Sequence, residues 1–190
     1  MSMRDLVLIS RSFRRFYESA QIPRQTLEEL VDLGRLCPSG SNLQPLKYCI
    51  VNTPEKAAQV FQTLSWAGYL PDWDGPKEGE RPAAYIVILG DTAISKGPYC
   101  DHGISAQTIM LGAAERGLGG CIIGSIKRDQ LREILGLPAH LEILLALALG
   151  KPVEKVILED IGADGSIKYY RDERHAHHVP KRKLTDVIIS

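Results

Sequence analysis

Apolar residues lie along the chain in runs and spacings that predict alternating helices and strands. The nearly continuous apolar stretches 83–90 and 141–149 predict two buried strands, and 46–51 predicts a third. The stretch 119–124 leads into a fourth strand. Because the intervals between these strands are irregular, the pattern favours a mixed sheet flanked by helices over a regular parallel winding.

The segments between the predicted strands carry helix signals. Leu27 and Leu30 recur at helical spacing behind a capping box formed by Thr26 and Glu29, and Pro38 would end this helix. The other predicted helices are a short turn over 3–9, a helix from the N-cap Thr53 and Pro54 to about Leu64, a long helix from Pro98 to Gly117, and 127–135 closed by Gly136.

The part of the chain after Gly150 is polar, and only 184–189 is apolar again. An apolar segment behind a polar stretch needs burial. It could add as an edge strand to its own sheet or to the sheet of a partner subunit, and the pattern leaves both alternatives open.

The chain has 190 residues, and 23 Lys and Arg balance 23 Asp and Glu. This size favours one compact domain over 1–190, and the neutral balance gives no electrostatic case for nucleic acid or membrane partners. The longest apolar run, 143–149, is far shorter than the roughly 20 residues that span a bilayer. Residues 1–15 do not resemble a signal peptide, so we expect a cytoplasmic protein. Four scattered cysteines, Cys37, Cys49, Cys100 and Cys121, predict reduced thiols.

Two basic clusters could bind an anion. Arg11, Arg14 and Arg15 place three guanidinium groups within five residues around the Ser12 hydroxyl, which suits a phosphate monoester. The simpler interpretation is a solvated helix end. A second cluster, Lys181, Arg182 and Lys183, could equally be a solvated turn.

The loop 38–45 carries hydroxyls and amides between two prolines. Side chains that both donate and accept hydrogen bonds suit the edge of a heteroaromatic ring such as a flavin. In isolation, the favoured interpretation is an ordinary loop whose Ser and Asn side chains satisfy their own backbone.

Other short patterns exclude more than they support. The glycines of 117–124 lie between a helix and a strand, the reverse of a dinucleotide fingerprint, so they either allow close approach of a flat ligand or merely turn the chain. Gly150-Lys151 lacks the upstream glycine of a P-loop. No hydrolase motif occurs. His175, His177 and His178 have no completing ligand set, so we expect no metal site and a mobile surface segment instead.

Taken in order, the segments 11–16, 38–45, 117–124 and 179–183 resemble the FMN-dependent nitroreductase family. The resemblance spans nearly the whole chain. It implies an α+β fold with a mixed, mainly antiparallel central sheet. It also implies a homodimer whose subunits exchange terminal segments and share two FMN sites at the interface.

The resemblance also implies the residues of the FMN site. The phosphate and ribityl end of FMN would be held by Arg11, Ser12, Arg14 and Arg15 together with Lys181, Arg182 and Lys183. The flavin would be touched by loop residues of the partner subunit, namely Pro38, Ser39, Gly40, Ser41, Asn42 and Gln44. The flavin ring would be lined by Cys121, Ile122, Ile123 and Gly124. Ser10 departs from the family pattern, since many relatives carry an arginine there. Residues 66–73 lie where the family shapes its substrate pocket, and we expect Trp66 to pack.

The implied activity is electron transfer from NAD(P)H through FMN to a small oxidised acceptor, such as a nitroaromatic or a quinone. A ping-pong order is expected, and no acid–base residue is required because the flavin carries the redox chemistry. Three alternatives stay open: a flavin-holding or sensor protein without turnover, a flavin-modifying or dehalogenating enzyme, and a histidine metal protein.

Overall fold

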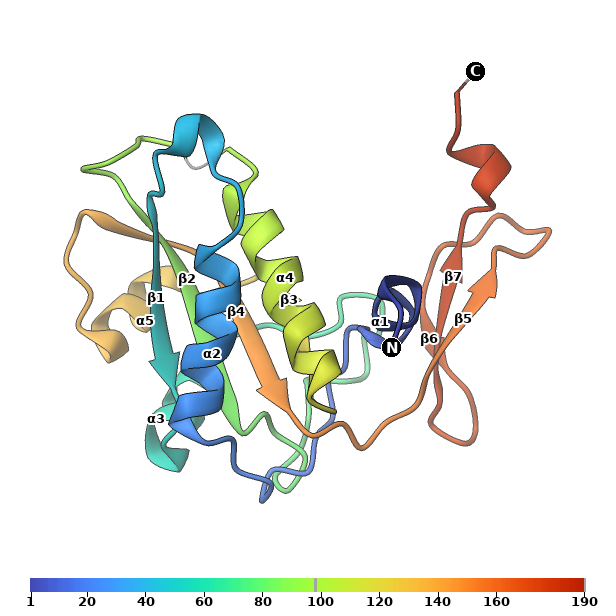
Figure 1. Cartoon of the computed structure of the whole chain (residues 1–190). Helices are drawn as coiled ribbons and strands as arrows, with labels where there is room; N and C mark the ends of the chain where they lie inside the picture. Colours follow the sequence, from blue (N-terminus) through green and yellow to red (C-terminus); the bar gives the residue numbers. More distant parts are fainter. Residues whose placement is uncertain (98, 190) are drawn as a thin grey trace.

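The computed structural model describes residues 1–97 and 99–189. Its central sheet has the strand order β1-β2-β4-β3, with every neighbouring pair antiparallel (Figure 1). The strands are β1 (Leu46–Val51), β2 (Ala84–Asp91), β3 (Gly119–Ile123) and β4 (Leu141–Gly150). All four predicted strands are therefore confirmed, and so is the mainly antiparallel α+β class.

Helices cover both faces of this sheet because side chains alternate along each strand. Ile86 and Ile88 of β2 face a core formed with α2 (Arg24–Arg35) and α4 (Asp101–Glu115). Tyr85 and Val87 face a second core, formed with α3 (Pro54–Phe61) and α5 (Arg128–Leu135). The whole of β2 is buried, as its apolar composition predicts.

The helix ends follow some of the sequence signals. Gly117 and Gly136 adopt positive φ at the ends of α4 and α5, as predicted. The capping box at Thr26 is wrong, because α2 already begins at Arg24 behind Pro23. α3 ends at Phe61 rather than near Leu64. α4 begins at Asp101, and its predicted start, Pro98, lies outside the described residues. α1 (Met3–Ile9) is a full helix capped by Ser2 rather than a short turn.

The polar part of the chain after Gly150 forms a second sheet that the sequence pattern does not predict. It consists of β5 (Val156–Asp160), β6 (Tyr170–Arg171) and β7 (His177–Lys181), in the order β5-β7-β6. β5 pairs with β7 in parallel, and the sheet lies beside α1 (Figure 1).

The apolar segment 184–189 does not join a sheet of its own chain. It begins with the 3-10 turn η2 (Leu184–Asp186), and Leu184 and Ile189 are 72% and 93% exposed. The own-sheet alternative is therefore wrong. The four cysteines are free thiols, with Cys121 buried and Cys100 exposed. None of the helices in the described ranges has the length and apolar character needed to cross a bilayer.

Candidate functional site

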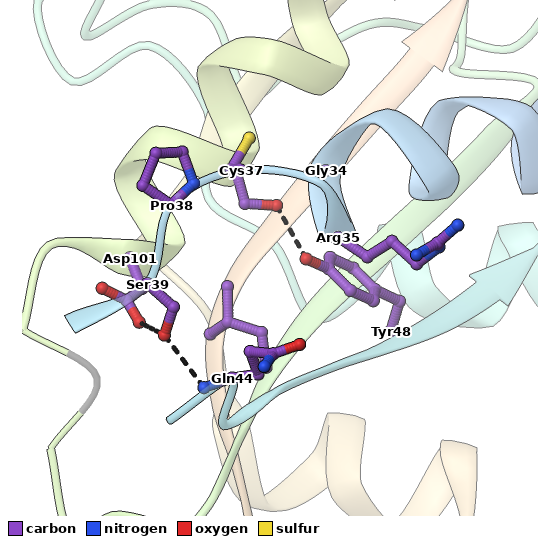
Figure 2. Close-up of a pocket in the computed structure, with 10 residues that line it drawn as sticks. Gly34, Arg35, Cys37, Pro38, Ser39, Gln44, Tyr48 and Asp101 are labelled. Carbon is purple, nitrogen blue, oxygen red and sulfur yellow. Dashed lines mark hydrogen bonds between the residues drawn. The ribbon is translucent and has the colours of Figure 1, made fainter. Parts of the chain in front are cut away.

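The polar loop 38–45 is built around the side chain of Asp101, the first residue of α4 (Figure 2). Ser39 Oγ donates to Asp101 at 2.6 Å, and the Gly40 N–H donates to it at 3.0 Å. The Gln44 N–H in turn donates to Ser39 Oγ at 2.9 Å. Asp101 is buried, so these bonds fix the loop on the core rather than leaving it to solvent.

The same loop holds an uncommon backbone conformation. Ser41, Asn42 and Gln44 have φ values of 51°, 55° and 53°, a region that side chains other than glycine rarely occupy. Such conformations persist only where the surroundings impose them, and they gather at binding sites. Pro38, Ser39 and Gln44 line a cavity of about 160 Å³ at this end of α4.

The arginine segment 11–16 lies along the edge of the central sheet. The Phe13 N–H donates to the Gly120 carbonyl of β3 at 2.9 Å, and Ser12 bridges to Gly120 in parallel. A Cβ on Gly119 would lie 2.5 Å from the Phe13 ring, and one on Gly120 only 2.2 Å from the Ala148 carbonyl oxygen. These two glycines therefore make room for the chain itself.

The arginine segment and the C-terminal sheet enclose a cavity of about 300 Å³, here called the cationic cavity. Three cationic side chains, Arg11, Arg14 and Lys181, reach it from opposite ends of the sequence. Its lining is completed by Ser10, Ser12, Gln107, Met110, Gly120, Ile122, Val156, Tyr169, His177 and Val179. The structure thus brings one member of the second basic cluster to the first.

Arg11 is anchored at the end of α1. Its Nε donates to the Ser10 carbonyl and its Nη2 to the Val7 carbonyl, both at 2.6 Å. Carbonyl groups at a helix C-terminus carry partial negative charge and lack helical partners, so a cation is stabilised there. Burial lowers the pKa of the Arg11 guanidinium from its ordinary value. The side chain is therefore held at the cavity wall.

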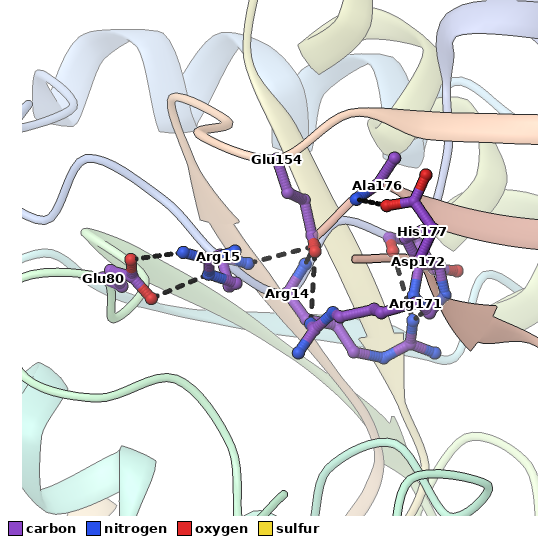
Figure 3. A network of polar contacts seen from close by, with 9 residues as sticks. Arg14, Arg15, Glu80, Glu154, Arg171, Asp172, Ala176 and His177 are labelled. Carbon is purple, nitrogen blue, oxygen red and sulfur yellow. Dashed lines mark hydrogen bonds and ion pairs between the residues drawn. The ribbon is translucent and has the colours of Figure 1, made fainter. Parts of the chain in front are cut away.

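Arg14 is surrounded on several sides (Figure 3). Its Nη1 lies 3.3 Å from both the Ser12 carbonyl and Nε2 of His177. Its guanidinium carbon lies 4.9 Å from the centre of the Tyr169 ring, a cation–π contact. The orientation of Arg14 is therefore set by the C-terminal segment.

Glu154 ties the arginine segment to that C-terminal segment. Its side chain is 1% exposed, and its oxygens accept hydrogen bonds from the backbone N–H groups of Arg14 and Arg15. Arg171 Nη2 lies 3.2 Å from the same carboxylate, and the Arg171 guanidinium lies over the Trp73 ring. One buried carboxylate therefore holds three separate segments together.

A third cavity, of about 210 Å³, shares Arg14 and Ile122 with the cationic cavity. It is lined further by 121–125 and by 65–68, including Trp66, and we call it the tryptophan cavity. The Trp66 ring packs on Phe61 at 5.7 Å, so it both packs and forms part of the wall. Burial raises the pKa of the Cys121 thiol, which keeps it protonated.

Comparison with known proteins places this architecture in a family. The model of the nitroreductase family matches residues 10–151, three quarters of the chain. The chain belongs to the nitroreductase family. The matched region contains Arg11, Arg14 and the central sheet, whereas β5, β6 and β7 lie beyond it.

Individual relatives are distant. A protein of Archaeoglobus fulgidus named NADH dehydrogenase/NAD(P)H nitroreductase is 26% identical over 157 residues, covering 78% of this chain and 85% of the relative. A 4-nitrobenzoate reductase of Pseudomonas putida is 24% identical over 201 residues, covering 83% and 88%. A nitroreductase of Exiguobacterium sibiricum, solved in complex with FMN, has a TM-score of 0.66 at 18% identity, covering 80% and 89%. The last likeness shows the fold.

Some residues that family resemblance suggested do not line the cationic cavity of this chain. Arg15 instead forms a forked ion pair with Glu80, at 2.8 Å from Nε and 2.6 Å from Nη2. Arg182 and Lys183, which follow Lys181 in the sequence, are exposed and do not line the cavity. The loop residues Pro38, Ser39, Gly40, Ser41, Asn42 and Gln44 also lie outside it.

The histidine segment is not wholly at the surface as expected: His175 is exposed, but His177 is buried and His178 is half-buried. His178 lies between Glu159 at 2.8 Å and Asp172 at 3.3 Å, and these carboxylates raise its pKa. His177 is buried. Burial, together with the nearby Arg14 and Arg171, lowers its pKa to about 4. Within the described residues, no cluster of His, Cys, Asp or Glu is arranged to hold a metal ion.

Sequence reasoning missed Glu154 and Tyr169, and it considered His177 only as a metal ligand or a surface residue. All three lie in the polar segment after Gly150, which carries no strong periodicity. His177, Val179 and Lys181 are spaced two residues apart, which is the spacing of one face of a strand. In the structure, all three line the cavity from the same face of β7.

Proposed function

We propose that the cationic cavity binds the phosphate of FMN and that the chain is an FMN-dependent NAD(P)H oxidoreductase. The observation that carries the proposal is the convergence of Arg11, Arg14 and Lys181 beside the Ser12 hydroxyl. Guanidinium and ammonium donors match a phosphate dianion in charge and geometry. The apolar lining residues Met110, Ile122 and Val156 suit the carbon atoms that follow the phosphate.

The tryptophan cavity is the proposed place of the flavin ring. It is continuous in its lining with the cationic cavity through Arg14 and Ile122, and it offers the backbone and side chains of Cys121, Ile123 and Gly124. Unlike Gly119, Gly124 has open space before it, since a Cβ there would meet only Leu145 at 3.9 Å. A flat ligand can therefore approach the chain at this position.

A homodimer is proposed to complete the site. The loop 38–45 is polar and lines a separate cavity, and none of its residues lines the cationic cavity of its own chain, so the proposal places it against the flavin of a partner subunit. The exposed apolar side chains of Leu184, Val187 and Ile188 suit burial against that partner.

When bound, the flavin supplies the hydride chemistry, taking electrons from NAD(P)H and giving them to a nitroaromatic or quinone acceptor in two separate half-reactions. The chain itself has to hold the phosphate, orient the ring and keep one face accessible. Relatives named for NAD(P)H and for 4-nitrobenzoate support this donor and this class of acceptor. Residues 65–68 border the ring cavity and would limit which acceptor fits.

The test begins with the absorbance spectrum of the purified protein and stopped-flow mixing with NADH and NADPH. A bound flavin that either nicotinamide reduces, and that the acceptor then reoxidises, supports the proposal. A bound flavin that neither NADH nor NADPH reduces would favour the flavin-holding or sensor alternative. A chemically altered flavin or released halide among the products would favour the flavin-modifying or dehalogenating enzyme.

The residue assignment is tested with an Arg11→Ala/Arg14→Ala variant. We expect FMN affinity to fall by at least about 100-fold, since each charge-assisted hydrogen bond contributes about 1.5–3 kcal/mol. Arg174→Ala, which removes an exposed arginine that does not line the cavity, is the matched control and should leave affinity unchanged. Equal flavin affinity in the double variant and the wild type would show that the phosphate assignment is wrong.

A further inference from the structure

His177 lies directly behind Arg14 and is almost fully enclosed. Its exposed fraction is 1%, and its backbone N–H donates to the Lys155 carbonyl at 2.8 Å, which fixes it on β7. Tyr169 packs against the imidazole with 5.1 Å between ring centres. The ring therefore has little freedom to move away from the arginine.

The contact between the two side chains fixes the state of the imidazole. A guanidinium can only donate hydrogen bonds, so Nε2 of His177, 3.3 Å from Arg14 Nη1, has to accept. The imidazole is then neutral and carries its proton on Nδ1. Nδ1 is buried and has no hydrogen-bond partner in the described part of the chain. The contact with Arg14 thus determines which nitrogen of His177 is protonated, and the protonated Nδ1 has no hydrogen-bond partner among the described residues.

Arg14 also receives its backbone anchor from this region, through Glu154. Glu154, Tyr169 and His177 all lie beyond residue 151, where the match to the family ends. Without them, a long arginine side chain at the junction of two cavities would sample many rotamers, and ordering it on binding would cost affinity.

We propose that His177 is a positioning residue that, as a neutral hydrogen-bond acceptor, holds the Arg14 guanidinium toward the cationic cavity for a phosphate monoester. The inference rests on the proposed function, because it takes the FMN phosphate as the ligand. His177 acts through Arg14 and needs no contact with the ligand.

The experiment measures FMN and riboflavin affinity by fluorescence titration of apoprotein for the wild type, His177→Leu and His177→Gln, each with and without Arg14→Ala. His177→Leu removes the acceptor, and we expect FMN affinity to fall about 5- to 20-fold, since a hydrogen bond to a charged group is lost. His177→Gln keeps an oxygen acceptor near the position of Nε2 and should stay within about 2-fold of the wild type.

Two readouts separate positioning from general stability. Riboflavin lacks the phosphate, so its affinity should not respond to His177→Leu. In the Arg14→Ala background, His177→Leu should have no further effect on FMN affinity, because the two residues act as one unit. Equal losses for FMN and riboflavin, or fully additive losses, would overturn the inference.

The wild type provides a measurement that does not depend on a variant folding. Nitrogen NMR of the imidazole at pH 7 should show a neutral ring protonated on Nδ1, whereas protonation on Nε2 would overturn the proposal. If Arg14→Ala alone leaves FMN affinity unchanged, the phosphate assignment fails. If Arg14→Ala weakens FMN binding and His177→Leu does not, only the present inference fails.

Discussion

Glu154 and Arg14 are joined by a hydrogen bond from the Arg14 backbone N–H to Oε1 of Glu154, across 140 residues of sequence. The carboxylate also pairs with Arg171, and it is almost completely buried. We expect Glu154→Ala to lower the free energy of unfolding by about 3–5 kcal/mol, because a buried cation and two N–H groups lose their acceptor.

Urea denaturation measures this loss. Glu173→Ala, which removes an exposed carboxylate from the same segment, should change the free energy of unfolding by less than about 0.5 kcal/mol. A Glu154→Ala protein as stable as the Glu173→Ala control would show that the carboxylate does not hold the segments together.

Arg15 is expected to contribute to stability and not to cofactor binding. Arg15→Lys replaces the forked pair with Glu80 by a single contact, and we expect a loss of about 1–2 kcal/mol in the free energy of unfolding. FMN affinity should stay near that of the wild type. A fall in FMN affinity as large as that caused by Arg14→Lys would place Arg15 in the phosphate site instead.

Lys181 and Lys183 form a matched pair two residues apart, of which only Lys181 lines the cationic cavity. Lys181→Ala should weaken FMN binding about 10-fold at low salt, and the difference from the wild type should shrink as salt screens the charge. Lys183→Ala should bind FMN as the wild type does. Fluorescence titrations at two salt concentrations check this, and equal effects of both variants would contradict the cavity assignment.

The pKa of His177 predicts how stability depends on pH. The unfolded chain takes up a proton at this histidine near pH 6.5, whereas the folded chain does so only near pH 4, so the unfolded state binds more protons in between. Stability should therefore fall as the pH is lowered from about 6.5 to about 4, by about 2–3 kcal/mol from this group. His177→Gln should flatten this part of the curve.

His178 acts in the opposite direction. Its pKa is raised, chiefly by its hydrogen bonds to Glu159 and Asp172, so its contribution is fully present below pH 6.5 and is lost as the pH rises through the folded value. Denaturation midpoints of the wild type and His177→Gln between pH 4 and 8 separate the two residues. If the denaturation midpoints of the wild type and His177→Gln fall equally as the pH is lowered from about 6.5 to about 4, the buried neutral state of His177 is contradicted.

The central sheet could be predicted from the sequence because its strands are strongly apolar. β2 and β4 lie in the middle of the sheet, and their nearly continuous runs of apolar residues have no other stable placement. The C-terminal sheet could not, because β5 and β7 are only five residues long, pair over a separation of 21 residues, and β7 is largely polar.

The site shows the same division. The residue types at Arg11, Ser12 and Arg14 fit either a phosphate site or a solvated helix end, and the structure brings Lys181 to them. The burial of His177 and Glu154 depends on tertiary packing, and nothing in the composition of their neighbourhood indicates it. The start of α2 at Arg24 likewise follows from Pro23, which overrode the capping signal at Thr26.

The cationic cavity takes one wall from 10–14 and the opposite wall from 156–181. A ribosome makes Arg11 long before it makes Lys181, so a growing chain exposes half of a phosphate site with nothing to close it. Under the proposed assignment, the phosphate site is complete only after the C-terminal segment has left the ribosome and docked on the arginine segment.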